Sequence, residues 1–212
     1  MPLQTRTRWQ SPERARRYSD GRFGNASAAG RDPALVAACL RRHAREQNPS
    51  VLDAPCGNGR LFAGLAACHA AVTGLDASDA MLAPARSIGL PLVLGDVARL
   101  PFLDGSFDHV VCCRLFHHLH ERDERLAVAR ELVRVARSLV IASFWDSASL
   151  PGLRRRLGWK RDEGPGGRVA VPRAHMAEVF AAAGADVIDV RRAFPLVSQQ
   201  AFLVARKRVH AP

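Results

Sequence analysis

Short apolar runs alternate with longer amphipathic stretches along most of the chain. The runs that predict strands lie at 51–53, 71–75, 91–95, 107–113, 138–143, 186–190 and 201–206. Between several of them, apolar residues recur at helical spacing, notably in 121–136 and 172–183. The run at 107–113 is apolar at nearly every position, which is typical of a parallel strand buried on both faces. The alternation predicts an α/β fold.

Two positions predict where helices begin. Asp32 is followed by Pro33, so we expect the acid to cap a helix whose first turn holds the proline. Ser78 precedes a second amphipathic stretch and is a suitable cap there. Gly184 ends the stretch 172–183 in the way that glycine commonly ends a helix.

Polar residues stand where the first two strands end. Asp53 closes the first run and is followed by a turn that contains Gly57 and Gly59 and by a helix-like segment from Leu61. Small residues in such a turn let the backbone approach a ligand closely. Asp76 closes the second run, where an acid can accept both hydroxyls of a ribose. These two acids in successive β–α units predict a site for a nucleotide-like ligand.

Composition fits one domain of ordinary size. The chain has 212 residues, 48% of them hydrophobic, enough for a sheet covered on both faces. No early segment predicts a secretory signal, and no stretch predicts a transmembrane helix. The five cysteines form no C-x-x-C pair, so we expect a reduced, cytoplasmic protein without a zinc site.

The chain is strongly basic, with a formal net charge of +11. Lys160 and Lys207 are its only lysines, so arginine carries nearly all of the positive charge. This bias, together with abundant alanine, is as typical of a GC-rich genome as of a nucleic-acid-binding face. The charge still favours anionic partners and leaves a nucleic-acid substrate open.

The stretch 51–60 resembles motif I of the class I S-adenosylmethionine-dependent methyltransferases, of the small type 11 kind. It matches that motif at Asp53, Cys56, Gly57 and Gly59 and departs from it at Pro55. The resemblance implies a Rossmann-like, seven-stranded, mostly parallel sheet of order 3-2-1-4-5-7-6, with strand seven antiparallel and helices on both faces. It also implies S-adenosylmethionine as cofactor. The positions it assigns to the cofactor are Asp53, Ala54, Cys56, Gly57, Asn58, Gly59, Asp76, Ala77, Met81, Asp96, Val97 and Cys113.

The most specific match is 100–108, Leu-Pro-Phe-Leu-Asp-Gly-Ser-Phe-Asp, which resembles a stretch of the same family. By this resemblance Asp96 accepts from the adenine amino group, and Val97 offers its backbone N–H to a ring nitrogen. Met81 would line the adenine, although core packing explains a methionine on a helical face equally well. The methionine ammonium is expected at the carbonyls of Cys112 or Cys113.

The acceptor is marked far less clearly. His117 and His118 follow the fourth strand and are candidate general bases, although the family often has this pattern where it only packs or orients. Phe144 and Trp145 end the fifth strand and are either walls of a substrate pocket or core residues. Arg114 is a further residue that we expect to contact the acceptor. We predict no metal, because a zinc site would need further ligands in fixed geometry.

Two segments stand apart from the regular pattern. Residues 1–30 form an irregular arm that either caps the cofactor or is a tail. Residues 151–171 are basic and rich in glycine, which predicts a lid over the acceptor or a solvated loop. The rest, 31–212, is expected to be a single methyltransferase domain that includes this insertion.

The predicted function is methyl transfer from S-adenosylmethionine to a small-molecule or lipid-like acceptor, by in-line attack on the sulfonium methyl. Placing the acceptor correctly would supply most of the catalysis. Three alternatives remain: an RNA methyltransferase, a catalytically silent cofactor-binding subunit of a partner, and a nicotinamide oxidoreductase. Pro55 disfavours the last, because it stands where a dinucleotide-binding loop has its first glycine. The sequence predicts neither the acceptor nor the oligomeric state.

Overall fold

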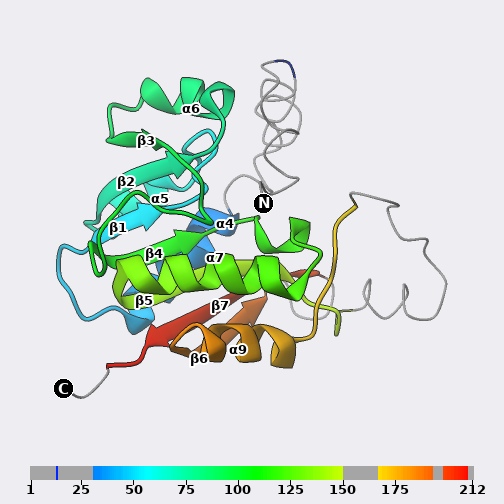
Figure 1. Cartoon of the computed structure of the whole chain (residues 1–212). Helices are drawn as coiled ribbons and strands as arrows, with labels where there is room; N and C mark the ends of the chain where they lie inside the picture. The colour runs from blue at the N-terminus through cyan, green and yellow to red at the C-terminus, as the bar shows by residue number, and fades with distance from the viewer. Residues whose placement is uncertain (1–12, 14–30, 150–166, 193–197, 210–212) are drawn as a thin grey trace.

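The computed structural model of the chain describes residue 13 and residues 31–149, 167–192 and 198–209. Its strands form one sheet of order β3-β2-β1-β4-β5-β7-β6 (Figure 1). All neighbouring strands are parallel except β7, which is antiparallel to both β5 and β6. The strands are β1 (Ser50–Asp53), β2 (Ala71–Asp76), β3 (Leu92–Leu94), β4 (Phe107–Cys112), β5 (Ala136–Trp145), β6 (Ala185–Arg192) and β7 (Gln200–Lys207). The predicted sheet is confirmed.

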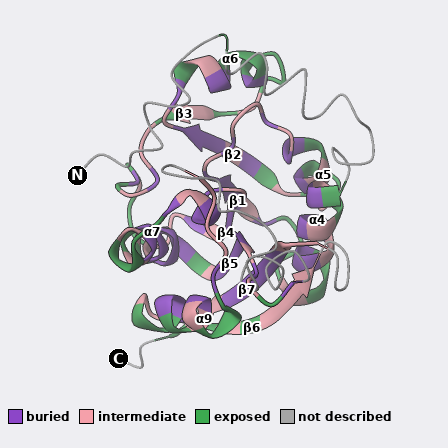
Figure 2. Ribbon diagram, turned by 90° about the vertical axis from the view of Figure 1, so that its right-hand side faces the viewer, coloured by how far each residue is buried: buried purple, intermediate pink, exposed green. Residues whose placement is uncertain are grey.

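Helices cover both faces of the sheet. α7 and α9 lie against one face, and α4 and α5 lie against the other (Figures 1 and 2). The described helices are α4 (Arg31–His43), α5 (Phe62–Ala66), α6 (Asp79–Arg86), α7 (Arg122–Val135) and α9 (Arg173–Ala182), with a 3-10 turn η1 (Phe116–His118) after β4. None of the described helices combines the length and apolarity needed to cross a bilayer.

The core is split in two by the sheet, because successive strand residues point to opposite faces. In β4, Val110 and Cys112 join the cluster under α7 and α9, whereas Val111 joins the cluster under α4, α5 and α6. Figure 2 shows the central strands buried and the outer surfaces of the helices exposed. This double burial explains why the strand sequences are apolar at nearly every position.

Side chains define several helix ends, and the predicted cap at Ser78 is confirmed. Ser78 accepts a hydrogen bond from the Met81 N–H at 3.2 Å and caps α6. A capping box formed by Glu121 and Glu124 starts α7. At the other end of α7, the Lys207 ammonium donates to the carbonyls of Arg134 and Ala136 at 3.0 and 2.8 Å. This contact lets the chain pass directly from α7 into β5, which is longer at both ends than the predicted strand.

The prediction that Asp32 caps a helix is wrong. Asp32 lies inside α4, and its carboxylate accepts hydrogen bonds from Arg60 and Arg114 instead. A cap would use that carboxylate locally, whereas the fold uses it to join three segments that are distant in sequence. The predicted arm 1–30, apart from Glu13, lies outside the described residues. So does most of the predicted lid 151–171, which is described only from residue 167.

Candidate active site

The loop after β1 is attached to both neighbouring strands. Ala54 donates its N–H to the Val111 carbonyl of β4 at 2.9 Å. Two residues later, Cys56 donates its N–H to the Leu75 carbonyl of β2 at 2.8 Å. The loop therefore crosses from one neighbour of β1 to the other, directly above the carboxyl end of β1.

Gly57 forms the centre of this loop. Its φ is +57°, a left-handed conformation that favours glycine, and its N–H donates to the Asp76 carboxylate at 2.9 Å. A Cβ at this position would lie 3.2 Å from the Met81 Cε. Gly59 also has a positive φ, of +77°. The loop is therefore a cradle that side chains would distort or fill.

Asp76 connects the loop to the start of α6. One carboxylate oxygen accepts from Gly57, and the other accepts from the Ser78 N–H at 2.9 Å. Burial raises the pKa of the Asp76 carboxyl, and the backbone donors oppose that rise. A carboxylate fixed in this way keeps lone pairs for hydroxyl donors of a ligand.

Asp53 differs from Asp76 because neither of its oxygens has a hydrogen-bond partner among the described residues. The residue is fully buried at the end of β1. Burial raises the pKa of its carboxyl to about 8; the Arg60 charge lowers this pKa and the Asp76 charge raises it further. A buried polar group without a partner is costly, so this carboxyl indicates a binding site for a ligand.

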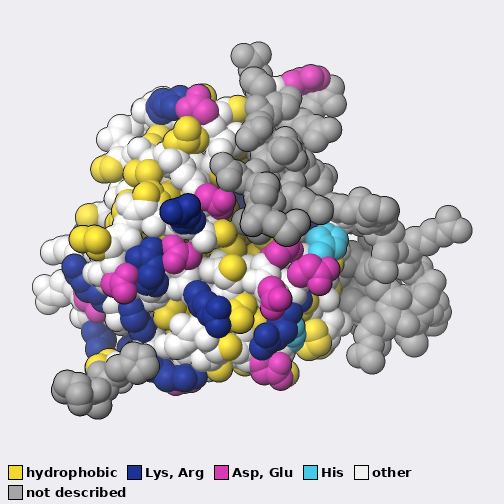
Figure 3. Space-filling view, viewed as in Figure 1, with side chains coloured by type: hydrophobic (Ala, Val, Ile, Leu, Met, Phe, Trp, Pro, Cys, Tyr) yellow, Lys and Arg dark blue, Asp and Glu magenta, His cyan; other side chains and the backbone are white. Residues whose placement is uncertain are grey.

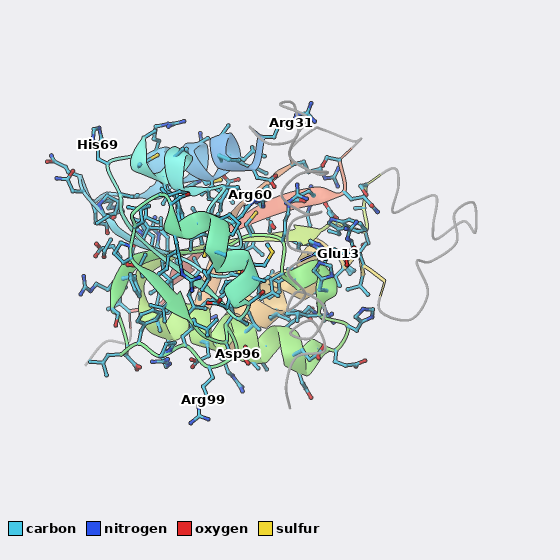
Figure 4. All side chains as sticks on the ribbon, turned by 90° about the horizontal axis from the view of Figure 1, so that it is seen from above. Glu13, Arg31, Arg60, His69, Asp96 and Arg99 are labelled. Carbon is cyan, nitrogen blue, oxygen red and sulfur yellow. The ribbon has the colours of Figure 1, made fainter. Side chains whose placement is uncertain are left out.

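Asp96 follows β3 and continues the row of strand-end acids. Its carboxylate accepts from the Ala98 N–H at 3.0 Å, and the Gly95 N–H donates to the Asp76 carbonyl at 3.0 Å. Figure 4 shows Asp96 within the body of the protein and Arg99, three residues later, pointing away from it. The three acids thus follow adjacent strands β1, β2 and β3 at one edge of the sheet.

The remaining predicted cofactor positions fall into two groups. Ala77, Gly57 and Asn58 are partly exposed, as loop residues that could meet a ligand. Val97 and Met81 are buried, and Val97 is part of the core cluster under α7. Val97 follows β3 and Met81 lies in α6, and both side chains pack against protein.

A cluster around Asp32 was not predicted. Its Oδ2 accepts from Arg60 Nη1 and Arg114 Nε, both at 2.7 Å. Arg60 Nη2 also lies 3.0 Å from the Cys113 Sγ, and the Arg114 N–H donates to the Ser143 hydroxyl at 2.7 Å. Burial raises the pKa of the Cys113 thiol to about 11, so the thiol is neutral. The cluster places two guanidinium groups beside the end of β4.

Two signals could have revealed this cluster. Arg60 stands at the entry to α5, where the helix dipole disfavours a cation, so a nearby acid was to be expected. Arg114 has a φ of +63°, a left-handed conformation that is strained for a residue with a side chain. The first signal is visible in the sequence, but the second exists only in the folded chain.

Several planar groups lie close together around Trp145, one of the residues predicted to contact the acceptor. The His117 ring lies against the Trp145 ring, with centroids 5.1 Å apart and planes at 15°. The His118 ring is 4.3 Å from that of His117, and the Arg168 guanidinium lies 5.2 Å from the Trp145 centroid. Trp145 and His118 are partly exposed, whereas His117 is buried.

Phe144, a predicted pocket wall, is fully buried in the core cluster under α7 and α9. The core alternative that the sequence left open therefore describes its position. Adjacent strand residues point to opposite faces, so Trp145 cannot share this environment.

The described part of the predicted lid, from residue 167, is held against this stack. The Val169 N–H donates to the His117 carbonyl at 2.9 Å, and the Val171 N–H donates to the Trp145 carbonyl at 2.8 Å. The His120 ring lies 2.9 Å from the Gly167 carbonyl. Within the described residues, no three His, Cys, Asp or Glu side chains come together as a metal site.

The residues fit the cofactor that the family resemblance implies. The loop at Gly57 has no side chain that would keep a ligand from the backbone, and the Gly57 N–H fixes the Asp76 carboxylate beside it. Asp53 supplies a buried carboxyl without a partner for a cationic group. S-adenosylmethionine carries both a ribose and such cationic groups, which makes it a chemical match to this edge of the sheet.

Comparison with known proteins agrees with this geometry. A family model described as a methyltransferase domain matches residues 51–138. A protein of Encephalitozoon cuniculi that is named as a methyltransferase is 45% identical over 86 residues, 40% of this chain and 39% of that protein. A Bos taurus protein named "Probable tRNA methyltransferase 9B" is 30% identical over 98 residues, 45% of this chain and 21% of that protein. The chain thus matches less than half the length of either relative.

Among solved structures, the chain is similar to the magnesium protoporphyrin IX methyltransferase of Synechocystis PCC 6803, crystallised with bound SAH. The TM-score is 0.75 and the identity 22%, over 96% of this chain and 98% of that one. At this identity the likeness shows the fold. Residues 51–138 therefore match a methyltransferase domain, and the sheet order is that of the Rossmann-like methyltransferase fold.

Proposed function

We propose that the protein transfers a methyl group from S-adenosylmethionine to a small-molecule or lipid-like acceptor. The observation that supports this most directly is the row of acids after β1, β2 and β3, in which Asp76 is fixed by two backbone donors and Asp53 has no partner. A ribose fits the fixed carboxylate, and a cation fits the carboxyl without a partner.

When bound, the cofactor supplies an electrophilic methyl carbon on a sulfonium. The chain's own task is to hold the acceptor in line with that carbon and to exclude water, which is catalysis by proximity and orientation. The loop 54–59 and Asp76 would fix the adenosyl part, and Asp96 would accept from the adenine. The end of β4 at Cys113 would receive the methionine part, next to Arg60 and Arg114.

The acceptor would bind beside the exposed part of Trp145, next to His118. A partly exposed indole offers an apolar face to a flat or hydrophobic molecule. His117 or His118 would remove a proton only from an acceptor that is protonated at working pH. The similarity in fold to a porphyrin methyltransferase is consistent with an acceptor of this kind.

Calorimetry tests the cofactor directly. We expect S-adenosylmethionine to bind with a stoichiometry of one, and NADH to give no heat of binding. Transfer of label from methyl-labelled S-adenosylmethionine to a library of apolar small molecules then tests turnover. Binding of NADH without binding of S-adenosylmethionine would contradict the proposal.

An RNA acceptor is the second candidate, because the chain carries a net charge of +11 and one relative is named for tRNA. On the face that bears α7, however, the Lys and Arg side chains lie among Asp and Glu side chains (Figure 3). RNA binding that weakens steeply between 50 and 200 mM salt, with label transferred to RNA, would favour this candidate over a small molecule.

A further inference from the structure

Among the buried acids of the described residues, Asp53 is the one whose carboxyl oxygens have no hydrogen-bond partner. It has no exposed surface, and neither of its carboxyl oxygens has a partner among the described residues. Its neighbour on β2, Asp76, is in contrast held by two backbone N–H groups. A buried carboxylate without donors is far less stable than the neutral acid, because burial removes the water that would solvate its charge.

We propose that Asp53 carries a proton in the empty protein and releases it when the cationic methyl donor binds, so that its carboxylate becomes the counter-charge of the donor. The inference rests on the proposed function, since it assumes that S-adenosylmethionine binds here. In the step, the O–H bond of the Asp53 carboxyl breaks and the proton passes to the solvent buffer.

The charged and titratable groups that face Asp53 support this assignment. Arg60, from the loop after β1, is a cation that lowers the pKa of the Asp53 carboxyl, but burial outweighs it and the Asp76 charge opposes it. Burial raises the pKa of the Cys56 thiol in the same loop and of the Cys112 thiol on β4, and the Asp53 charge raises both further. They are neutral thiols with and without a ligand and do not exchange the proton.

The donor changes this balance. Its methionine part carries an ammonium, a sulfonium and a carboxylate, so it brings one net positive charge into a poorly solvated site. An added cation within a few ångströms favours the ionised form of a carboxyl. The same adenosine without this charge, as in 5′-methylthioadenosine, has no such effect.

Calorimetry in two buffers of different ionisation enthalpy counts the protons released on binding. The titrations are run at pH 6.5, where the α-ammonium of the donor is charged. We expect about one proton to be released per S-adenosylmethionine bound, because a carboxyl with a pKa of about 8 is protonated at this pH. We expect 5′-methylthioadenosine to release none.

The variant Asp53→Asn assigns the proton to its residue, because the amide has the same shape and cannot ionise. S-adenosylmethionine should bind to it without releasing a proton, whereas the control Asp79→Asn, at an exposed acid of α6 that pairs with Arg86, should release as much as the wild type. Release that persists in Asp53→Asn, or equal release with 5′-methylthioadenosine, would overturn the proposal. Binding of the donor to the wild type without any release would also overturn it, while leaving the proposed function intact. Absence of binding would instead contradict the proposed function.

A second measurement uses the empty protein. A carboxyl whose pKa is higher in the folded than in the unfolded state stabilises the fold at low pH and loses this contribution as the pH rises. The unfolding free energy of the wild type minus that of Asp53→Asn should therefore fall between pH 5 and pH 8, up to the folded pKa of about 8. A difference that is constant over this range would contradict a protonated Asp53.

Discussion

Two fully buried acids, Asp53 at the end of β1 and Asp146 just after β5, differ in their hydrogen-bond partners and in the direction of their pKa shifts. The Asp146 carboxylate accepts from Arg173 and Arg192, each at 2.7 Å, and from the Ala148 N–H at 2.9 Å. These donors outweigh its burial and lower the pKa of its carboxyl. Asp53 has no hydrogen-bond donor within the part of the chain that the structure describes, and burial raises the pKa of its carboxyl.

The difference shows that burial alone does not identify a functional acid. Asp146 joins β5, α9 and β6 through its arginines, so its charge is part of the fold. Asp53 contributes a buried carboxyl whose oxygens have no hydrogen-bond partner among the described residues, which is what a site for a cationic ligand requires. Substitutions that separate stability from ligand binding can test this distinction.

The largest expected effect is on stability. Asp146→Asn should lower the free energy of unfolding by about 3 kcal/mol, because it leaves two arginines beside a site without a charge. Asp53→Asn at pH 6.5 should change it by less than about 1.5 kcal/mol, because one neutral polar group replaces another. Urea denaturation of both variants at pH 6.5 measures the two values. Equal losses would mean that both acids are structural.

The next effect is on cofactor binding. Asp76→Ala should weaken S-adenosylmethionine binding by about 1.5–3 kcal/mol, roughly 10- to 150-fold, through loss of charge-assisted hydrogen bonds to the ribose. Asp79→Ala is the matched control, because Asp79 is an exposed acid in the first turn of α6 that pairs with Arg86. Calorimetry should show no change in affinity for this control. Unchanged affinity in Asp76→Ala would place the ribose elsewhere.

A smaller effect is expected from replacing glycines by alanine, which separates the cost of backbone strain from a loss of cofactor affinity. Gly57 and Gly89 both have positive φ, +57° and +78°, but only Gly57 has a neighbour, the Met81 Cε, near the position of a Cβ. Each change to alanine should cost about 1–2 kcal/mol of stability from the left-handed backbone. Only Gly57→Ala should also weaken cofactor binding, as measured by calorimetry. Equal affinities of the two variants would remove the loop from the site.

The smallest expected effect is the loss of stability when the contact between Arg168 and the Trp145 ring is removed. Arg168→Gln should lower stability by about 0.5–1 kcal/mol through loss of the contact with the Trp145 ring. A double-mutant cycle with Trp145→Leu, followed by urea denaturation, isolates this contact from other interactions of Arg168. A coupling energy of zero would show that the stack does not hold the segment that begins at residue 167.

The sequence determined the sheet and the cofactor side of the site. Buried strands must be apolar at nearly every position, and acids at strand ends must meet at one edge of a parallel sheet, so both leave short local patterns. Local patterns placed Asp53, Asp76 and Asp96 after three predicted strands, the family resemblance implied the order of those strands, and the structure confirms that order. The roles of these residues in binding stay predictions.

Only the tertiary structure decided which polar groups meet. Asp32 looked like a helix cap until Arg60 and Arg114 approached its carboxylate, and Phe144 could be pocket wall or core until β5 fixed which face it occupies. Asp146 is charged in the folded protein because Arg173 and Arg192, up to 46 residues away in the chain, donate to its carboxylate. Asp53 has no such partner among the described residues. Partners at such separations are set by the packing of whole elements, and no local pattern records them.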